Sequence, residues 1–204
     1  LGYGLTAVIL DAALCNVPQS RTRFFLIGKR GEKDNFLLAA LRSGLSHQQM
    51  TIREYLGDTL GINYYYRHPR NYSRRGIFSI DEPSPTVRGV NRPVPPNYVK
   101  HPADPRDISL AEIRPLTTIE RSYLQTFPKS FCFKGTKSNL EQMIGNAVPV
   151  NMANYVAKHI LAYANKEIQH LLFNELVYSS IVLPERALKP LHQADFLLEY
   201  SYAP

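Results

Sequence analysis

Apolar and polar positions near the start of the chain alternate in a way that predicts two strands. The apolar runs are "LTAVILDAAL" (residues 5–14) and "RFFLIG" (23–28), and Pro18 suits the loop between them because it has a fixed φ and no N–H. Extending the second strand backwards through "NVPQSRTRFFLIG" places three polar side chains on one face, about 6.5 Å apart: Gln19, Arg21 and Arg23. These residues alone are explained most simply by a strand that begins in solvent, with arginines that pair with surface carboxylates.

Sequence patterns typical of helices follow the two predicted strands. Two short helices are predicted, over residues 36–44 and 52–58. Asp34 or Asn35 is expected to cap the first helix, and Thr51 with Glu54 forms a capping box for the second. Strands followed by helices indicate an α/β arrangement for this part of the chain.

Residues 62–106 differ in composition from the rest of the chain. Eight of the fifteen prolines and a cluster of tyrosines lie here, with eight basic but only three acidic residues, so the segment carries +5 of the net charge of +7. Dense proline predicts irregular loops with short strands such as "GIFSI" (76–80). A disordered linker is the alternative, but the aromatic content favours a small ordered insertion that binds an anionic partner.

Helical patterns return after the insertion. Two capping boxes, Thr117 with Glu120 and Ser138 with Glu141, predict helices, the first for "TIERSYLQTF". A long helix is expected from Pro149 to about Tyr178, with an apolar stripe typical of core or interface packing: Met152, Val156, Ile160, Ala164, Ile168, Leu171 and Leu172.

The residues by themselves indicate no reaction. The 204 residues, 44% hydrophobic, suffice for a buried core, but they include no glycine-rich loop after a strand and no zinc spacing. Cys15 and Cys132 match no metal or disulfide pattern, which favours a reducing, cytoplasmic compartment; Cys15 is either a nucleophile or, more often for a buried cysteine, inert packing. No apolar run reaches the length of a membrane span and no signal peptide is visible, so no membrane partner is expected.

Three motifs in a fixed order resemble a known family. They are "NVPQSRTRFFLIG", then, after the arginine-rich insertion, "RPLTTIERSYLQTFPKSF", and finally "QMIGNAVPVNMANYVAKHI". Singly, Q-x-R-x-R and G-N-A-V are weak motifs, whereas R-x-L-T-x-x-E-x-x-x-L-Q-x-F-P is fairly specific. Together, over about residues 1–165, they resemble the C-terminal half of a bacterial DNA (cytosine-5) methyltransferase.

This resemblance implies the fold and its domains. The expected class is α/β: the C-terminal part of an S-adenosylmethionine-dependent methyltransferase fold, with a small, mostly β or irregular target-recognition domain inserted. Residues 1–60 are expected to end the catalytic domain, 61–113 to form the recognition insertion, and 114–178 to return to the catalytic domain as scaffold and helices. No role is assigned to the tail, residues 179–204.

The resemblance also implies site residues. Arg23 is expected to donate to O2 of a flipped cytosine, with Arg21 and Gln19 as supports that orient the pocket. S-adenosylmethionine is the expected cofactor, in contact with Asn146, Ala147 and Val148. Without the family, the preferred explanation of Asn146 is only a turn after a helix. Double-stranded DNA is the expected partner, in contact with Arg70, Arg74, Arg75, Thr86, Val87 and Arg88, of which Arg70 is the candidate base reader.

Three elements of the family are absent from these residues: the cofactor loop, the Pro-Cys nucleophile and the Glu that protonates the ring. We expect them in a missing N-terminal catalytic part, on the same or a separate chain, so that residues 1–204 alone are inactive. The chain then belongs to a restriction-modification methyltransferase. The alternatives are a non-catalytic recognition subunit of a two-chain enzyme and a tRNA cytosine methyltransferase, although the long insertion favours duplex DNA. Thr126 stands where the family usually has glycine, a departure that we expect to be tolerated.

Overall fold

The computed structural model describes residues 2–71 and 73–178, with side chains described as far as Lys166. Residues 1–163 form one compact unit, and of the second unit only the continuation of the last helix is described. The predicted tail therefore lies outside the described residues, as do the side chains of Ile168, Leu171 and Leu172. In the part that the structure describes, no helix is both long and apolar enough to cross a membrane.

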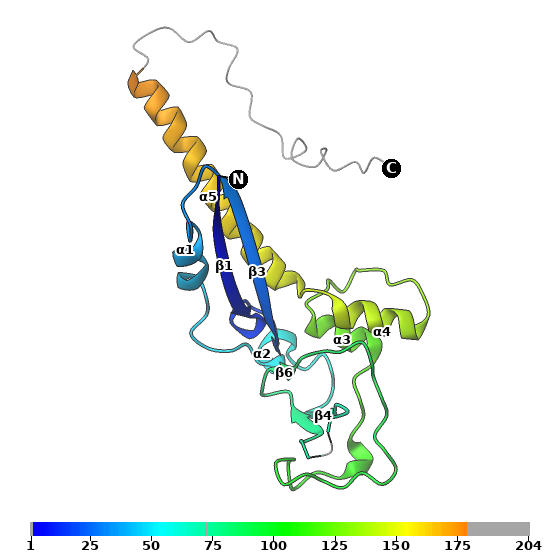
Figure 1. The fold of residues 1–204 in the computed structure, drawn as a ribbon. Coiled ribbons are helices and arrows are strands. Elements are labelled where there is room, and N and C mark those ends of the chain that lie inside the picture. The colour runs from blue at the N-terminus through cyan, green and yellow to red at the C-terminus, as the bar shows by residue number, and fades with distance from the viewer. Residues whose placement is uncertain (1, 72, 179–204) are drawn as a thin grey trace. The chain divides into compact units, whose positions relative to one another are not determined.

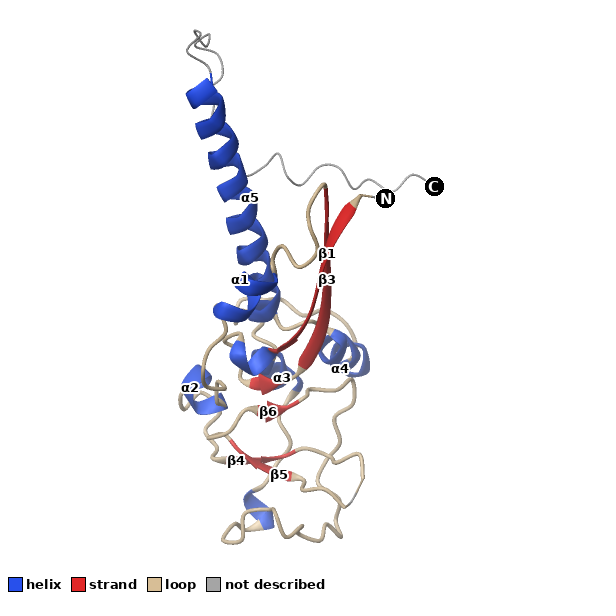
Figure 2. Cartoon of the chain, turned by 60° about the vertical axis from the view of Figure 1, so that its left-hand side comes forward, coloured by secondary structure: helices blue, strands red, loops and turns tan. Residues whose placement is uncertain are grey.

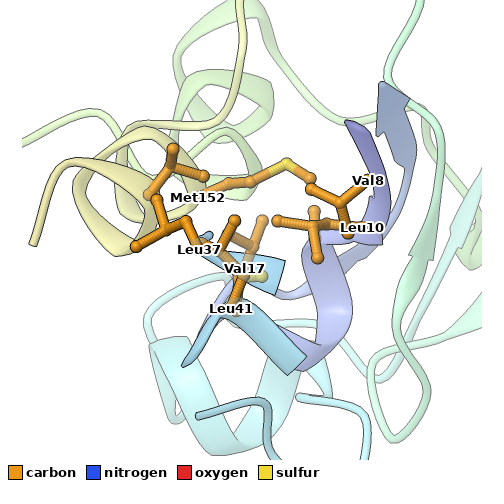
Figure 3. Packing of buried hydrophobic residues seen from close by; sticks show 9 residues of the cluster. Val8, Leu10, Val17, Leu37, Leu41 and Met152 are labelled. Atoms are coloured by element: carbon orange, nitrogen blue, oxygen red, sulfur yellow. The ribbon is translucent and has the colours of Figure 1, made fainter. Parts of the chain in front are cut away.

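A long antiparallel hairpin begins the chain. Strands β1 (Tyr3–Asp11) and β3 (Thr22–Arg30) pair along their whole length, as the two apolar runs predict. Every second residue of β1 is buried, so the hairpin has one covered and one open face. Helix α1 (Leu38–Ser43) and the first turns of α5 (Val150–Tyr178) lie beside the hairpin (Figures 1 and 2). The core on the covered side includes Val8, Leu10, Val17, Leu37, Leu41 and Met152 (Figure 3).

The polar stretch expected to form one strand is divided in two. Strand β2 (Gln19–Ser20) pairs in parallel with β6 (Ser84–Pro85), and β3 begins only after Arg21. Arg21 interrupts the strand because its backbone N–H donates to the Asp11 carboxylate (3.0 Å) instead of to a neighbouring strand. The prediction of one continuous strand is therefore wrong, and the division lets the chain leave the hairpin and reach the insertion.

One of the two caps predicted for the short helices is confirmed. The capping box is present in α2 (Ile52–Leu56). The cap predicted at Asp34 or Asn35 is wrong, since α1 follows Leu37 without any side-chain cap. The Asp34 carboxylate accepts instead from the backbone N–H of Leu5 in β1 (2.8 Å), so a contact with the hairpin replaces the local cap.

The proline-rich segment consists of loops and short strands, as predicted. Strand β4 (Tyr64–Tyr66) pairs antiparallel with β5 (Ile77–Ser79), which lies within the predicted strand, and a single 3₁₀ turn follows at Leu110–Glu112. In Figure 2, β6 lies between this pair and the hairpin. The Asp104 carboxylate fixes the loops by accepting hydrogen bonds from the backbone of Gly76, Ile77 and His101 and from the hydroxyl of Tyr98.

Two further helices precede α5, which begins directly after Pro149 as predicted. Helix α3 (Thr118–Leu124) carries the predicted capping box. Helix α4 (Lys137–Asn146) is capped by Thr136, so the box predicted at Ser138 is wrong. The glutamate of that box, Glu141, is buried in an ion pair with α3, and this tertiary contact replaces the local one.

Candidate functional site

Gln19 joins the insertion to the C-terminal helices. Its side chain is fully buried. The amide oxygen accepts from the backbone N–H of Val87 (2.8 Å), while the amide nitrogen donates to the carbonyl of Leu124 (3.2 Å) and to the side chain of Gln125 (3.0 Å). Both ends of the amide are thus held within the protein, which makes Gln19 a support for its neighbours.

Arg21 is buried as well, with 2% of its surface exposed. One arm of its guanidinium donates to the carbonyl of Val87 (2.9 Å) and the other to the carbonyl of Gly145 (2.9 Å). Burial, and then the nearby charge of Arg23, lower the pKa of Arg21 to about 10, so the group stays charged at neutral pH. The charged guanidinium of Arg21 thus links the backbone at Val87 to the backbone at Gly145 through two hydrogen bonds.

Arg23 differs from its two neighbours in the motif. It lies near the start of β3, half-buried, and one of its guanidinium nitrogens donates to the carbonyl of Thr22 (2.7 Å). Its other guanidinium donors have no hydrogen-bond partner among the described residues. The Nε of Arg21 is also unbonded but buried, so Arg23 is the arginine of this motif whose unbonded donors a ligand can reach.

The last residue of α4 and the two residues after it, 146–148, are the three expected to contact a cofactor and are called here the cofactor turn. Asn146 and Val148 are exposed and Ala147 is half-buried, and the Asn146 side chain makes no hydrogen bond within the described part of the chain. An unpaired amide beside an exposed apolar side chain fits a ligand that has both polar and apolar groups. The structure thus brings these residues together at an open surface.

The turn is preceded by a very close approach of two backbones. A Cβ on Gly145 would come within 2.2 Å of the backbone nitrogen of Gly89 and 2.3 Å of the carbonyl carbon of Arg88. Only glycine allows this contact, which sets the end of α4 directly against the segment Thr86–Gly89, called here the 86–89 segment.

A hollow of about 590 Å³ lies on the insertion. Arg67 and Phe78 are among the residues that line it. Five of the six residues expected to bind DNA line it as well: Arg70, Arg74, Arg75, Thr86 and Arg88. The sixth, Val87, does not line the hollow, because its side chain is only 5% exposed and its backbone is held by the buried Gln19 and Arg21.

The arginines of the hollow differ in how strongly the protein already holds them. Arg67 donates to the carbonyl of Thr86 (2.9 Å), and Arg88 donates to the carbonyl of His68. Arg75 pairs with Glu82 and stacks over the ring of Phe78, 4.3 Å from its centroid. The side chains of Arg70 and Arg74 are exposed and make no hydrogen bond or ion pair with described residues.

One residue of this region was missed by the sequence patterns. Arg121 in α3 is 6% exposed, donates to the carbonyl of Arg88 and forms a buried ion pair with Glu141. Nothing in the helical pattern distinguishes it, because arginine in an amphipathic helix is usually exposed. A buried, charged residue of this kind becomes visible only when its partners are in place.

Cys15 does not have the environment of a nucleophile. It is 3% exposed, and burial, followed by the charge of Asp11, raises the pKa of its thiol to about 11. The thiolate is the reactive form of cysteine, so this thiol is unreactive at neutral pH.

Comparisons with known proteins bear on the family of the chain. The family model described as C-5 cytosine-specific DNA methylase matches residues 1–162. Type II methyltransferase M.HindV of Haemophilus influenzae is 62% identical over 170 residues, covering 83% of this chain and 56% of that protein. Type II methyltransferase M.HgiDI of Herpetosiphon aurantiacus is 57% identical over 165 residues, covering 81% of this chain and 53% of that protein. The chain thus spans about half the length of these curated relatives.

The fold is also found in a solved structure. The crystal structure of the S. pombe Dnmt2 methyltransferase matches with a TM-score of 0.52 at 16% identity, over 80% of this chain and 59% of that chain. The α/β methyltransferase fold that the motifs imply is therefore confirmed. With a family model that matches most of its length, this chain belongs to the C-5 cytosine-specific DNA methylase family.

Proposed function

We propose that the chain is the C-terminal part of a DNA cytosine-5 methyltransferase, which transfers a methyl group from S-adenosylmethionine to C5 of a cytosine flipped out of duplex DNA. The observation that supports this most strongly is the hollow on the insertion, which gathers five of the six residues expected to bind DNA. An arginine-lined hollow fits a polyanion such as DNA. The proposed reaction, methyl transfer to cytosine, is inferred from the family to which the chain belongs.

Arg23 is the residue of this chain that acts on the base. A guanidinium that donates to O2 of cytosine holds the flipped base and stabilises the negative charge that develops on the ring during methylation. Arg21 and Gln19 act indirectly, because their side chains are bonded to the protein on both sides. They hold the backbone next to Arg23 and the insertion in a fixed relation.

Asn146, Ala147 and Val148 provide part of the cofactor wall. S-adenosylmethionine supplies the transferable methyl group when it is bound. The free amide of Asn146 offers a donor and an acceptor to a polar group of that cofactor, and the exposed Val148 offers an apolar contact. An upstream part provides the remainder of the wall.

Arg70 and Arg74 make the first contacts with duplex DNA, since their guanidiniums are exposed and not already bonded. Arg70 reads a base, and Arg74 binds a phosphate. Each phosphate contact contributes about 0.9 to the slope of log affinity against log salt. Arg74→Ala should lower that slope by about one unit, Arg70→Ala should relax discrimination at one base pair, and the exposed Arg106→Ala, outside the hollow, is the control.

An upstream part provides the thiolate and the ring-protonating acid. It also covers the open face of the hairpin, where β1 and β3 expose large apolar side chains: Tyr3, Leu5, Ile9, Phe24 and Leu26. Contiguous apolar surface of this kind marks an interface.

The experiment is a methyl-transfer assay with labelled S-adenosylmethionine, mixed-sequence duplex DNA and nucleoside analysis for 5-methylcytosine. We expect no product from residues 1–204 alone and product once the upstream part is present, for which the first half of M.HindV serves as a surrogate. Activity that requires two separate natural chains would assign this one as a recognition subunit. Product from residues 1–204 alone would overturn the assignment of the nucleophile to the upstream part.

A further inference from the structure

Three arginines from three parts of the chain hold the 86–89 segment by its backbone. Three successive carbonyls each accept a hydrogen bond from a guanidinium. The pairs are Arg67 to Thr86 (2.9 Å), Arg21 to Val87 (2.9 Å) and Arg121 to Arg88. Two of these donors, Arg21 and Arg121, are almost completely buried.

These arginines act as fixed donors. A buried guanidinium is costly unless it is fully hydrogen-bonded or paired, and Arg121 meets this condition through Glu141 on its other side. Burial, and then the charge of Arg88, lower the pKa of Arg67 to about 10, so its guanidinium stays charged at neutral pH. The backbone of the segment cannot shift without breaking several charge-assisted bonds at once.

The same segment is joined to the turn expected to contact the cofactor. The second arm of Arg21 donates to the carbonyl of Gly145, and the close approach at Gly145 leaves no space between α4 and the segment. Gln125 extends the connection, because its side chain donates to the carbonyls of Ile144 (2.6 Å) and Ala147 (3.4 Å) while accepting from Gln19. The segment and the turn therefore form one connected unit.

We propose that Arg67, Arg121 and Gly145 are positioning residues for sequence discrimination: they fix the 86–89 segment against the cofactor turn, so that the side chains of Thr86 and Arg88 meet the duplex in one geometry. This inference rests on the proposed function. A loosely held reading element can adapt to a wrong base pair, so loosening it reduces the penalty for mismatched sites more than it reduces turnover on the correct site.

The test compares kcat/KM on the target duplex with kcat/KM on duplexes that carry single base-pair changes, using the complete protein. Arg121→Lys keeps a charge for Glu141, but one ammonium cannot also serve the Arg88 carbonyl as the fork does. Gly145→Ala forces the two backbones apart. Each should lower the discrimination ratio by about tenfold, within the range that one base pair of readout provides. Arg106→Lys, on the exposed surface of the insertion, and Ser138→Ala, on the exposed surface of α4, are the matched controls and should leave the ratio unchanged.

Each outcome decides the question. If folded variants lose turnover equally on every duplex, the substituted residues have only a structural role, and that result overturns the inference. If Gly145→Ala does not fold, Arg67→Lys and Arg121→Lys carry the test. A wild-type protein that methylates no duplex contradicts the proposed function instead, so the two failures are distinguishable.

Discussion

At the scale of single residues, Thr126 explains a departure from the family motif. It has a φ of 57°, in the left-handed region that a β-branched residue rarely adopts and that glycine adopts easily. Its hydroxyl accepts from the backbone N–H of Asn151 at the start of α5 (2.9 Å). Threonine thus adopts an unfavourable backbone conformation at this position, and its hydroxyl gains a hydrogen bond that fixes the start of α5.

This balance can be measured by urea unfolding. Thr126→Gly should change stability by less than about 1 kcal/mol, because relief of about 1–2 kcal/mol of backbone strain offsets the lost hydrogen bond. Thr126→Val keeps the strain and leaves the Asn151 N–H without its partner, so it should cost about 1–3 kcal/mol. Equal losses in the two variants would show that the backbone conformation is not strained.

Arg23 carries the chemical prediction at this scale. In the complete enzyme, Arg23→Ala should leave duplex affinity nearly intact, since phosphate contacts dominate it, and should lower single-turnover methylation roughly a hundred- to a thousand-fold. Arg23→Lys should recover only part, because an ammonium does not reproduce the planar fork. Arg30→Ala, at the exposed far end of the same strand, is the control. Normal turnover of a folded Arg23→Ala protein would reduce Arg23 to an ordinary surface arginine.

At the scale of elements, the insertion depends on one carboxylate. Burial alone would raise the pKa of Asp104, but hydrogen bonds from Tyr98 and from the backbone of Ile77, His101 and Gly76 together lower it below its usual value of 3.8. A carboxyl group whose pKa is lower in the folded state than in the unfolded state stabilises the fold at pH values above its unfolded-state pKa. That contribution is lost as the pH falls through the folded pKa.

Asp104→Asn should therefore destabilise the protein most at neutral pH. The expected cost is about 1.5–3 kcal/mol, the range for hydrogen bonds to a charged group, and the difference from wild type should shrink as the pH falls below about 4. Melting curves at several pH values measure this, with the exposed Asp107→Asn as control. A difference that stays constant down to pH 3 would mean that the charge of Asp104 contributes nothing.

At the scale of the whole molecule, the hairpin has a face that the described residues leave open. Ile9, Phe24 and Leu26 are 71%, 62% and 59% exposed, although the opposite face is buried in β1 and half-buried in β3. Residues 1–204 alone should therefore self-associate, and Phe24→Thr with Leu26→Thr should restore monomers in sedimentation experiments. Val99→Thr, at an 85% exposed position of the insertion, should not. A wild-type chain that stays monomeric at high concentration would remove the case for a partner on this face.

Local patterns in the sequence were enough for much of this architecture. The hairpin strands, the caps of α2 and α3, the start of α5 and the proline-rich loops were all predicted, because period-two alternation, capping boxes and the fixed φ of proline act between neighbours a few residues apart. The motif order was enough for the family as well, and through it for the candidate site residues.

Tertiary structure decided what those residues do to one another. Asp34 and Glu141 have the sequence context of helix caps, yet both are used by distant partners. Arg21 breaks its strand and reaches carbonyls that lie 66 and 124 residues away, while the donor to Arg88 lies 33 residues away in α3. Contacts over such separations depend on how the whole chain closes, which no local pattern encodes. The sequence alone therefore indicated the family and proposed candidate site residues, and only the folded chain showed that the 86–89 segment and the cofactor turn are held together.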